Sequence, residues 1–234
     1  MKLNTTSLTL GFIALTSVSL AACQRTPAPE APSAEPAPVA EATVPAPLPA
    51  SEYLETLTEQ AFSATPDELD ALISQVRTAV VRDRGSLSSA AATELDQRLQ
   101  QITDDRAALK RADLAIASVE AFRLFVSAAP DTPPAAGVVP AEVSLLDYAG
   151  FRYQADLKAE PVRWDDAAAA ADYAAGQWDR ISARVTNEGL RTRFGNTVAE
   201  MKLAIKDRNA THAALVVTRE LDLVDELEAH FSGH

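Results

Sequence analysis

The chain contains a single thiol, Cys23, and its surroundings decide which chemistry is open to it. Lys2 is followed by an uncharged apolar run over residues 8–20, and the small pair Ala21-Ala22 separates this run from the cysteine. A positive start, an apolar segment and small residues are the three parts of an export signal. About 13 apolar residues are too few to cross a bilayer core, which needs roughly 20. The sequence therefore predicts a signal peptide over residues 1–22.

The segment Leu20-Ala21-Ala22-Cys23 resembles the lipobox of bacterial lipoproteins, which is a leucine, two small residues and a cysteine. The resemblance implies cleavage before Cys23, lipidation of its sulfur and acylation of its new amino group, with palmitate as a typical chain. One acyl chain holds a protein only marginally at a membrane, whereas three make a lasting anchor. Gln24 stands where an aspartate would retain a lipoprotein of Gram-negative bacteria in the inner membrane, so the resemblance favours the outer membrane, facing the periplasm. The alternative is an ordinary signal peptide with an incidental cysteine.

Residues 23–50 are expected to form a disordered tether behind this anchor. Residues 24–50 contain eight prolines and eight alanines in 27 positions and show no apolar periodicity. Such a segment cannot bury enough surface to offset its chain entropy. Proline-rich chains favour extended conformations of about 3.1 Å per residue, so the tether would act as a spacer.

Residues 51–234 have the composition of an all-α domain. Alanine, leucine, glutamate and arginine dominate, glycine is scarce, and no Asn-Gly or Asp-Gly hairpin signal appears. The apolar spacing predicts an elongated antiparallel bundle of about five to six helices. Because Cys23 is the only cysteine, no intrachain disulfide can form, but a domain of this length can bury a sufficient core without one.

Several helix boundaries are marked by particular residues. Thr65 and Glu68 around Pro66 form a capping-box pattern, and a second helix is expected from Ser88 or Ser89 to Ala128. A 40-residue helix would be about 60 Å long, so it must either lengthen the bundle or kink. Three further helical segments are expected, over residues 141–158, 165–185 and 190–231. The first should be buried centrally, and the last should bend near Asp207-Arg208-Asn209.

The two halves of this domain are loosely alike. Each has a medium helix, a turn with glycine and then a long segment with Ile-x-Asp near its middle, at Ile102 and Ile205. The pattern allows a duplication, and it is also what two unrelated amphipathic segments can show.

Metal or haem binding is one hypothesis that the sequence leaves open, because helical bundles often carry such sites in their cores. His212 falls in the expected apolar stripe, and Met201 lies on the same face. On one straight helix these two are about 16 Å apart, so they could not be the two axial ligands of one haem, although a Met–His pair from different helices is left open. His230 lies roughly 27 Å from His212, so the two histidines could not share one ion without a bend. The chain has no Cys-x-x-Cys-His haem motif and no Glu-x-x-His pair. A packed core histidine is the plainer interpretation of His212, and no metal site and no cofactor besides the lipid are predicted.

A set of aromatic residues in two neighbouring helical segments supports a second hypothesis. Its members could line a pocket for an apolar ligand, although aromatic side chains pack in most cores. The set comprises Tyr148, Phe151, Tyr153, Trp164, Tyr173 and Trp178.

The sequence contains no catalytic motif. It has no nucleophile elbow and no glycine-rich phosphate loop, and its only cysteine is the lipid site. The formal net charge of −12 argues against nucleic-acid binding, which needs a positive surface. The acids between Glu220 and Glu228 are expected to form a solvated helix face.

These observations predict a non-enzymatic envelope lipoprotein, held to the membrane by its lipid, whose bundle is a scaffold or binding module for another envelope protein. The alternative is a periplasmic bundle that binds a metal, haem or a small apolar ligand. The candidate ligand-binding residues are His212, Met201, Tyr153, Trp164 and Trp178.

Overall fold

The computed structural model describes residues 49–128 and 137–233. Cys23, the predicted signal peptide and nearly all of the predicted tether lie outside these ranges. All regular structure in the described residues is helical, which confirms the all-α prediction. The described ranges hold eight α-helices and two short 3₁₀ turns, more than the five to six helices expected. None of these helices is both long and apolar enough to cross a membrane.

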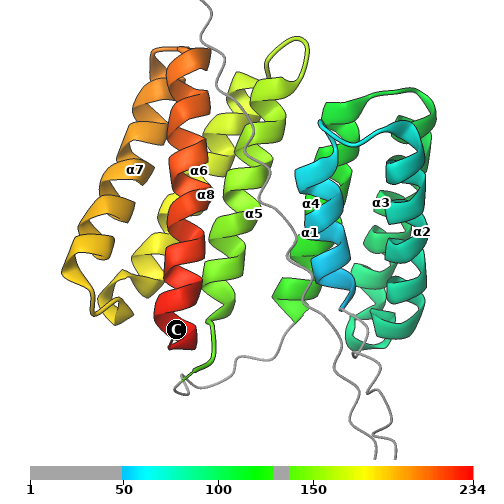
Figure 1. Cartoon of the computed structure of the whole chain (residues 1–234), viewed down its shortest axis with the longest axis horizontal. Helices are drawn as coiled ribbons and strands as arrows, with labels where there is room; N and C mark the ends of the chain where they lie inside the picture. Colours follow the sequence, from blue (N-terminus) through cyan, green and yellow to red (C-terminus); the bar gives the residue numbers. More distant parts are fainter. Residues whose placement is uncertain (1–48, 129–136, 234) are drawn as a thin grey trace, which may run out of the picture. The chain divides into compact units, whose positions relative to one another are not determined.

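The first four helices form an antiparallel four-helix bundle, here called the first bundle (Figure 1). Each helix contacts the next in sequence, and the fourth returns to contact the first. Its members are α1 (Ala50–Gln60), α2 (Pro66–Asp83), α3 (Ser89–Ala107) and α4 (Arg111–Ala128), with a 3₁₀ turn, Arg84–Ser86, between α2 and α3.

The last four helices form the second bundle in the same way, again with the fourth helix returning to the first. Its members are α5 (Ala141–Lys158), α6 (Trp164–Ile181), α7 (Glu188–Lys206) and α8 (Ala210–Ser232), with a 3₁₀ turn, Ser182–Arg184, between α6 and α7. Helices α4 and α5 contact each other and join the two bundles.

Both long helical segments expected from the sequence are broken into hairpins. The breaks lie at Leu109 and Arg208, which adopt left-handed backbone angles with φ of 58° and 46°. Next to them, the amide of Lys110 donates to the carbonyl of Asp105 and the amide of Asn209 donates to that of Ala204, which closes each helix end. Folding back buries apolar faces that an uninterrupted helix would expose to water. The bend expected at 207–209 is therefore a full reversal.

The likeness of the two halves extends to the order of their elements and to the lengths of their middle helices. Helices α2 and α6 have 18 residues each and α3 and α7 have 19, with a three-residue 3₁₀ turn between each pair. The left-handed turn follows at the same place in both bundles. The outer helices differ, with 11 residues in α1 against 18 in α5 and 18 in α4 against 23 in α8, so the agreement is confined to element order, the middle helices and the left-handed turn.

Side-chain caps set several helix starts as the sequence predicts. The hydroxyl of Thr65 accepts from the amide of Glu68, and the Glu68 carboxylate accepts from the amide of Thr65 at 2.7 Å, which confirms the capping box. Ser88 caps α3. Asn187 caps α7, which therefore begins at Glu188, close to the start that the sequence predicts at residue 190.

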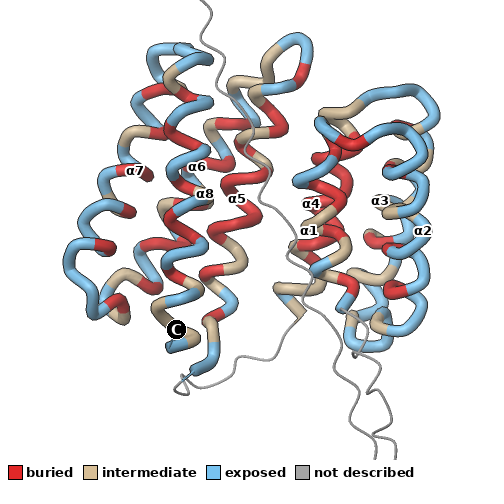
Figure 2. The backbone as a smooth tube through the Cα atoms, in the orientation of Figure 1, coloured by how far each residue is buried: buried red, intermediate tan, exposed pale blue. Residues whose placement is uncertain are grey.

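The core runs through both bundles. Helices α4 and α5 are buried along most of their lengths, because each packs within its own bundle and against the other (Figure 2). The central burial expected for residues 141–158 is confirmed. Leu54, Leu114, Leu146 and Leu223, from both bundles, belong to one cluster of buried apolar side chains. Acidic side chains between the bundles therefore lie in a water-poor environment.

Candidate functional site

A pair of hydrogen-bonded carboxyl groups joins the two bundles. Glu55 comes from α1 of the first bundle and Asp147 from α5 of the second. Burial and the charge of Glu55 raise the pKa of Asp147 well above its usual range. Burial raises the pKa of Glu55 to about 7, although the hydrogen bond from Asp147 works in the opposite direction. Ionising both carboxyl groups at such close range is unfavourable. Asp147 therefore keeps its proton and donates a hydrogen bond to the Glu55 carboxylate.

A third carboxyl group, Glu220 on α8, is buried next to this pair. Its side chain is completely excluded from solvent, and neither carboxyl oxygen has a hydrogen-bond partner in the described residues. Burial raises the pKa of Glu220 well above its usual range. An unpaired charge in such a place would be very costly, so Glu220 is neutral in the folded protein. Together, Glu55, Asp147 and Glu220 form what we call the carboxyl cluster.

Gly150 allows Glu220 to occupy this position. A Cβ atom at Gly150 would lie 2.1 Å from Oε2 of Glu220 and 2.7 Å from Cδ2 of Leu221, far inside contact distance. Only a residue without a side chain therefore lets α5 approach α8 while Glu220 points inward. Gly150 is one helical turn from Asp147, so Glu220 lies close enough to Asp147 that ionisation of Glu220 would raise the pKa of Asp147 further.

More acids surround the carboxyl cluster. Burial and the charge of Asp225 raise the pKa of Glu59, and burial, Asp225 and Glu52 raise the pKa of Glu228. No group of three or more acidic, histidine or cysteine side chains within residues 49–128 and 137–233 has the arrangement of a metal site. Asp147 and Glu220 are enclosed and protonated, whereas Glu55 is only half-buried.

A second polar network joins the bundles through paired charges. Glu120 of α4 accepts hydrogen bonds from the Tyr148 hydroxyl at 2.9 Å and from Arg152, both on α5, and from Arg123 at 3.1 Å. Burial would raise the pKa of Glu120, but Tyr148, Arg152 and Arg123 together lower it. Arg152 also donates to Asp156 at 3.0 Å. In contrast to the carboxyl cluster, Glu120 can stay ionised because its charge is compensated, whereas burial raises the pKa of Asp156 to about 6 despite its contact with Arg152.

The structure separates the histidine from the core in which it was expected. His212 is half-buried in the first turn of α8, and its amide donates to the Asn209 side chain. The buried stripe of α8 begins instead at Ala213 and includes Glu220, so the expectation of a core histidine and of a wholly solvated acidic face is wrong for these two residues. The spacing of Glu220 from Val217 could have signalled its burial.

The remaining candidate residues lie in several places. Met201 and Tyr153 are both buried and meet directly, since the Tyr153 hydroxyl donates to the Met201 carbonyl at 3.1 Å. Trp178 is buried and stacks on Phe194, with ring centroids 4.6 Å apart. Trp164 is half-buried at the start of α6.

The other tyrosines of the aromatic set follow the same pattern of ring-to-ring packing. Tyr148 meets Tyr173 edge to face, with ring centroids 5.2 Å apart. Trp178 and Tyr148 are buried by packing against other rings, Tyr173 is half-buried, and the Tyr148 hydroxyl reaches Glu120 of the first bundle. Comparison of the whole chain with protein-family models, curated proteins and solved structures found no match to any of them.

Proposed function

We propose that this chain is a lipid-anchored protein of the bacterial cell envelope whose tandem helical bundles bind another envelope protein. The observation that carries the proposal is the sequence Leu20-Ala21-Ala22-Cys23 behind an apolar signal, followed by a proline- and alanine-rich spacer. An anchor and a spacer together hold a folded domain at a chosen distance from a membrane. The outer membrane and the periplasmic side are part of this proposal.

A binding role accounts for the helical domain better than catalysis does. The polar groups that the fold buries include Asp147 and Glu220 of the carboxyl cluster, which are protonated, and Glu120, whose charge Arg152 compensates, and both sets lie between helices. The net charge of −12 favours a partner with a positive surface and disfavours nucleic acid. The alternative of a ligand held by His212 and the aromatic set has less support, because Trp178 stacks on Phe194 while His212 lies in the first turn of α8.

Replacing Cys23 by serine tests the anchor. We expect the wild-type chain in the membrane fraction and Cys23→Ser entirely in the soluble fraction, because the hydroxyl accepts no lipid and three acyl chains are lost. Fractionation and intact-mass measurement check this. A Cys23→Ser chain that stayed with the membrane would refute lipid anchoring, whereas loss of the acyl mass without folding defects would support it.

Crosslinking in intact cells tests the partner. The full chain should yield a crosslinked envelope protein that is absent when only residues 1–50 are expressed, since that truncated chain keeps the anchor and spacer but lacks the bundles. Equal recovery with both chains would attribute binding to the spacer or the lipid. Recovery of no protein partner would count against the binding module itself.

A further inference from the structure

A cavity of about 310 Å³ opens where the first bundle meets the end of α5. It is lined by the α1–α2 connection, the start of α4 and the α5–α6 connection. Four of its lining residues are cationic, Lys110, Arg111, Lys158 and Arg163, and two are acidic, Asp113 and Glu160. In a chain whose net charge is −12, this excess of positive charge is a local reversal of sign.

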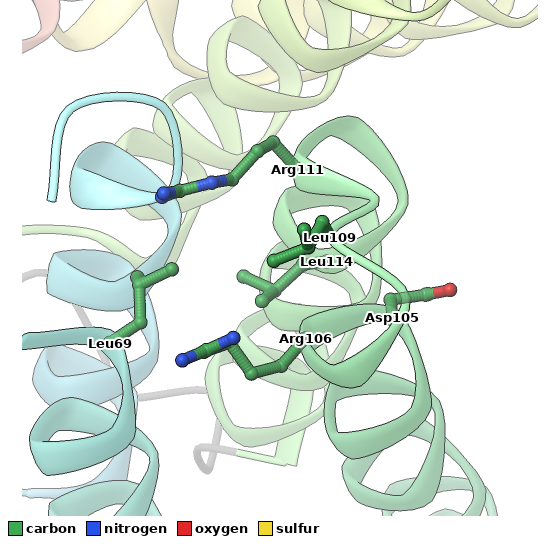
Figure 3. A pocket seen from close by; sticks show the side chains of 6 residues that line it. All are labelled: Leu69, Asp105, Arg106, Leu109, Arg111 and Leu114. Atoms are coloured by element: carbon green, nitrogen blue, oxygen red, sulfur yellow. The ribbon is translucent and has the colours of Figure 1, made fainter. Parts of the chain in front are cut away.

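The two arginines of the cavity are held in place by the protein. Arg163 pairs with Asp113, which neutralises both charges. One terminal nitrogen of Arg111 donates to the carbonyls of Ala61 and Ala64, both at 2.8 Å. Figure 3, which shows the adjoining pocket, places the Arg111 guanidinium at the end of α1. Because Arg111 bonds to uncharged carbonyls, its positive charge remains uncompensated beside the cavity.

The two lysines supply the charges that a ligand could use. The ammonium of Lys158 lies 4.1 Å from the centroid of the Phe62 ring, and its contact with Gln154 is long, at 3.5 Å. Lys158 is exposed overall, but partial burial of its side chain lowers its pKa, so its charge would gain from an anion. Lys110 is exposed at the start of α4. The first-turn amides of α4 add positive potential at the same wall of the cavity.

We propose that this cavity is a binding site for a small phosphate-bearing molecule, with Lys110 and Lys158 as its charged contacts. A phosphate offers several acceptor oxygens, which the ammonium groups of the two lysines that line the cavity can share. The formal charge of the lining residues, four cations against two acids, matches a dianion. This site is independent of the protein partner proposed above and of the residues predicted from the sequence.

Titration calorimetry of the full chain with inorganic phosphate and with glycerol 3-phosphate tests the proposal. Both ligands should bind, and glycerol should not. The double variant Lys110→Gln, Lys158→Gln should weaken binding about tenfold or more, because each lost contact is charge-assisted. Glu160→Gln should tighten binding, because it removes a carboxylate from the cavity wall.

Lys202→Gln is the matched control, since Lys202 is an exposed lysine on α7 that pairs with Asp172 at 2.8 Å. It should bind phosphate as the wild type does. Far-UV circular dichroism verifies that all variants fold. Absence of phosphate binding, or equal loss in Lys202→Gln and the double variant, would overturn the proposal. Weakening confined to the double variant, together with tightening in Glu160→Gln, would establish it.

Discussion

Glu220→Gln is expected to stabilise the protein increasingly as the pH rises from 5 to 8. Burial keeps Glu220 protonated in the folded state, while in the unfolded chain it ionises near its ordinary pKa of 4.5. Above that pH the unfolded state binds fewer protons than the folded state, so the stability of the wild type falls as the pH rises. Glutamine has nearly the same shape and does not titrate, so this loss is absent from the variant.

The expected size of the effect follows from one proton. The difference in unfolding free energy between Glu220→Gln and wild type should grow by about 1.4 kcal/mol per pH unit for as long as wild-type Glu220 keeps its proton. Urea unfolding of the full chain, followed by circular dichroism at several pH values, measures it. Glu55 should add a smaller loss between pH 4.5 and about 7, which is common to both proteins.

Glu226→Gln is the control for this experiment. Glu226 lies on the same helix but is exposed, and its hydrogen bond with Arg193 lowers its pKa. Its effect on stability should therefore be constant between pH 5 and 8. If the Glu220→Gln difference were equally constant, Glu220 would be ionised in the folded protein and the assignment of a neutral acid would be wrong.

Gly150→Ala is expected to destabilise the protein by about 2 kcal/mol, although alanine is the better helix former. The intrinsic preference for alanine favours the variant by about 1 kcal/mol. The new methyl group would, however, lie 2.1 Å from Oε2 of Glu220 and 2.7 Å from Leu221. Glu220 is fully buried and cannot turn aside into solvent, so the side chains must repack or α5 and α8 must separate, and overpacking of this kind costs about 1–3 kcal/mol or more.

Gly176→Ala provides the opposite result on a neighbouring helix. Gly176 is exposed in α6, and no atom lies within 4 Å of a Cβ placed there. That substitution should stabilise the protein by about 1 kcal/mol. The double variant Gly150→Ala, Glu220→Ala should recover much of the loss, because it removes the carboxyl group that the methyl group meets. Thermal unfolding of the four proteins compares them directly, and a Gly150→Ala protein as stable as Gly176→Ala would contradict the close approach of α5 and α8.

Local signals in the sequence were sufficient for the helix class and for several boundaries. Thr65 and Glu68 form the capping box that their spacing predicts, and the helix expected over 141–158 has those bounds. These features depend on neighbours a few residues away, which a sequence displays directly. Leu109 and Arg208 show where local reasoning fails. Neither is a glycine or a proline, yet each takes a left-handed conformation that ends a helix.

The carboxyl cluster could not be predicted from local signals either, because its three acids come from distant parts of the sequence. Glu55, Asp147 and Glu220 are far apart in sequence and lie on α1, α5 and α8. The spacing of Glu220 puts it on the inner face of α8, but only the packing partner decides whether an inner acid meets a lysine, water or a glycine. Here it meets Gly150 and lies near a hydrogen-bonded acid pair, and burial keeps it protonated.

By itself the sequence determined that the domain is helical, where many of its helices begin, and that its only cysteine follows a lipobox-like segment. Only the tertiary structure decided that the helices form two bundles, and that three acids meet in the core between α1, α5 and α8. The physical reason is the distance along the chain over which each kind of interaction acts. Caps and periodicity act within a few residues along the chain, whereas desolvation and a shared proton arise only when distant segments are packed together.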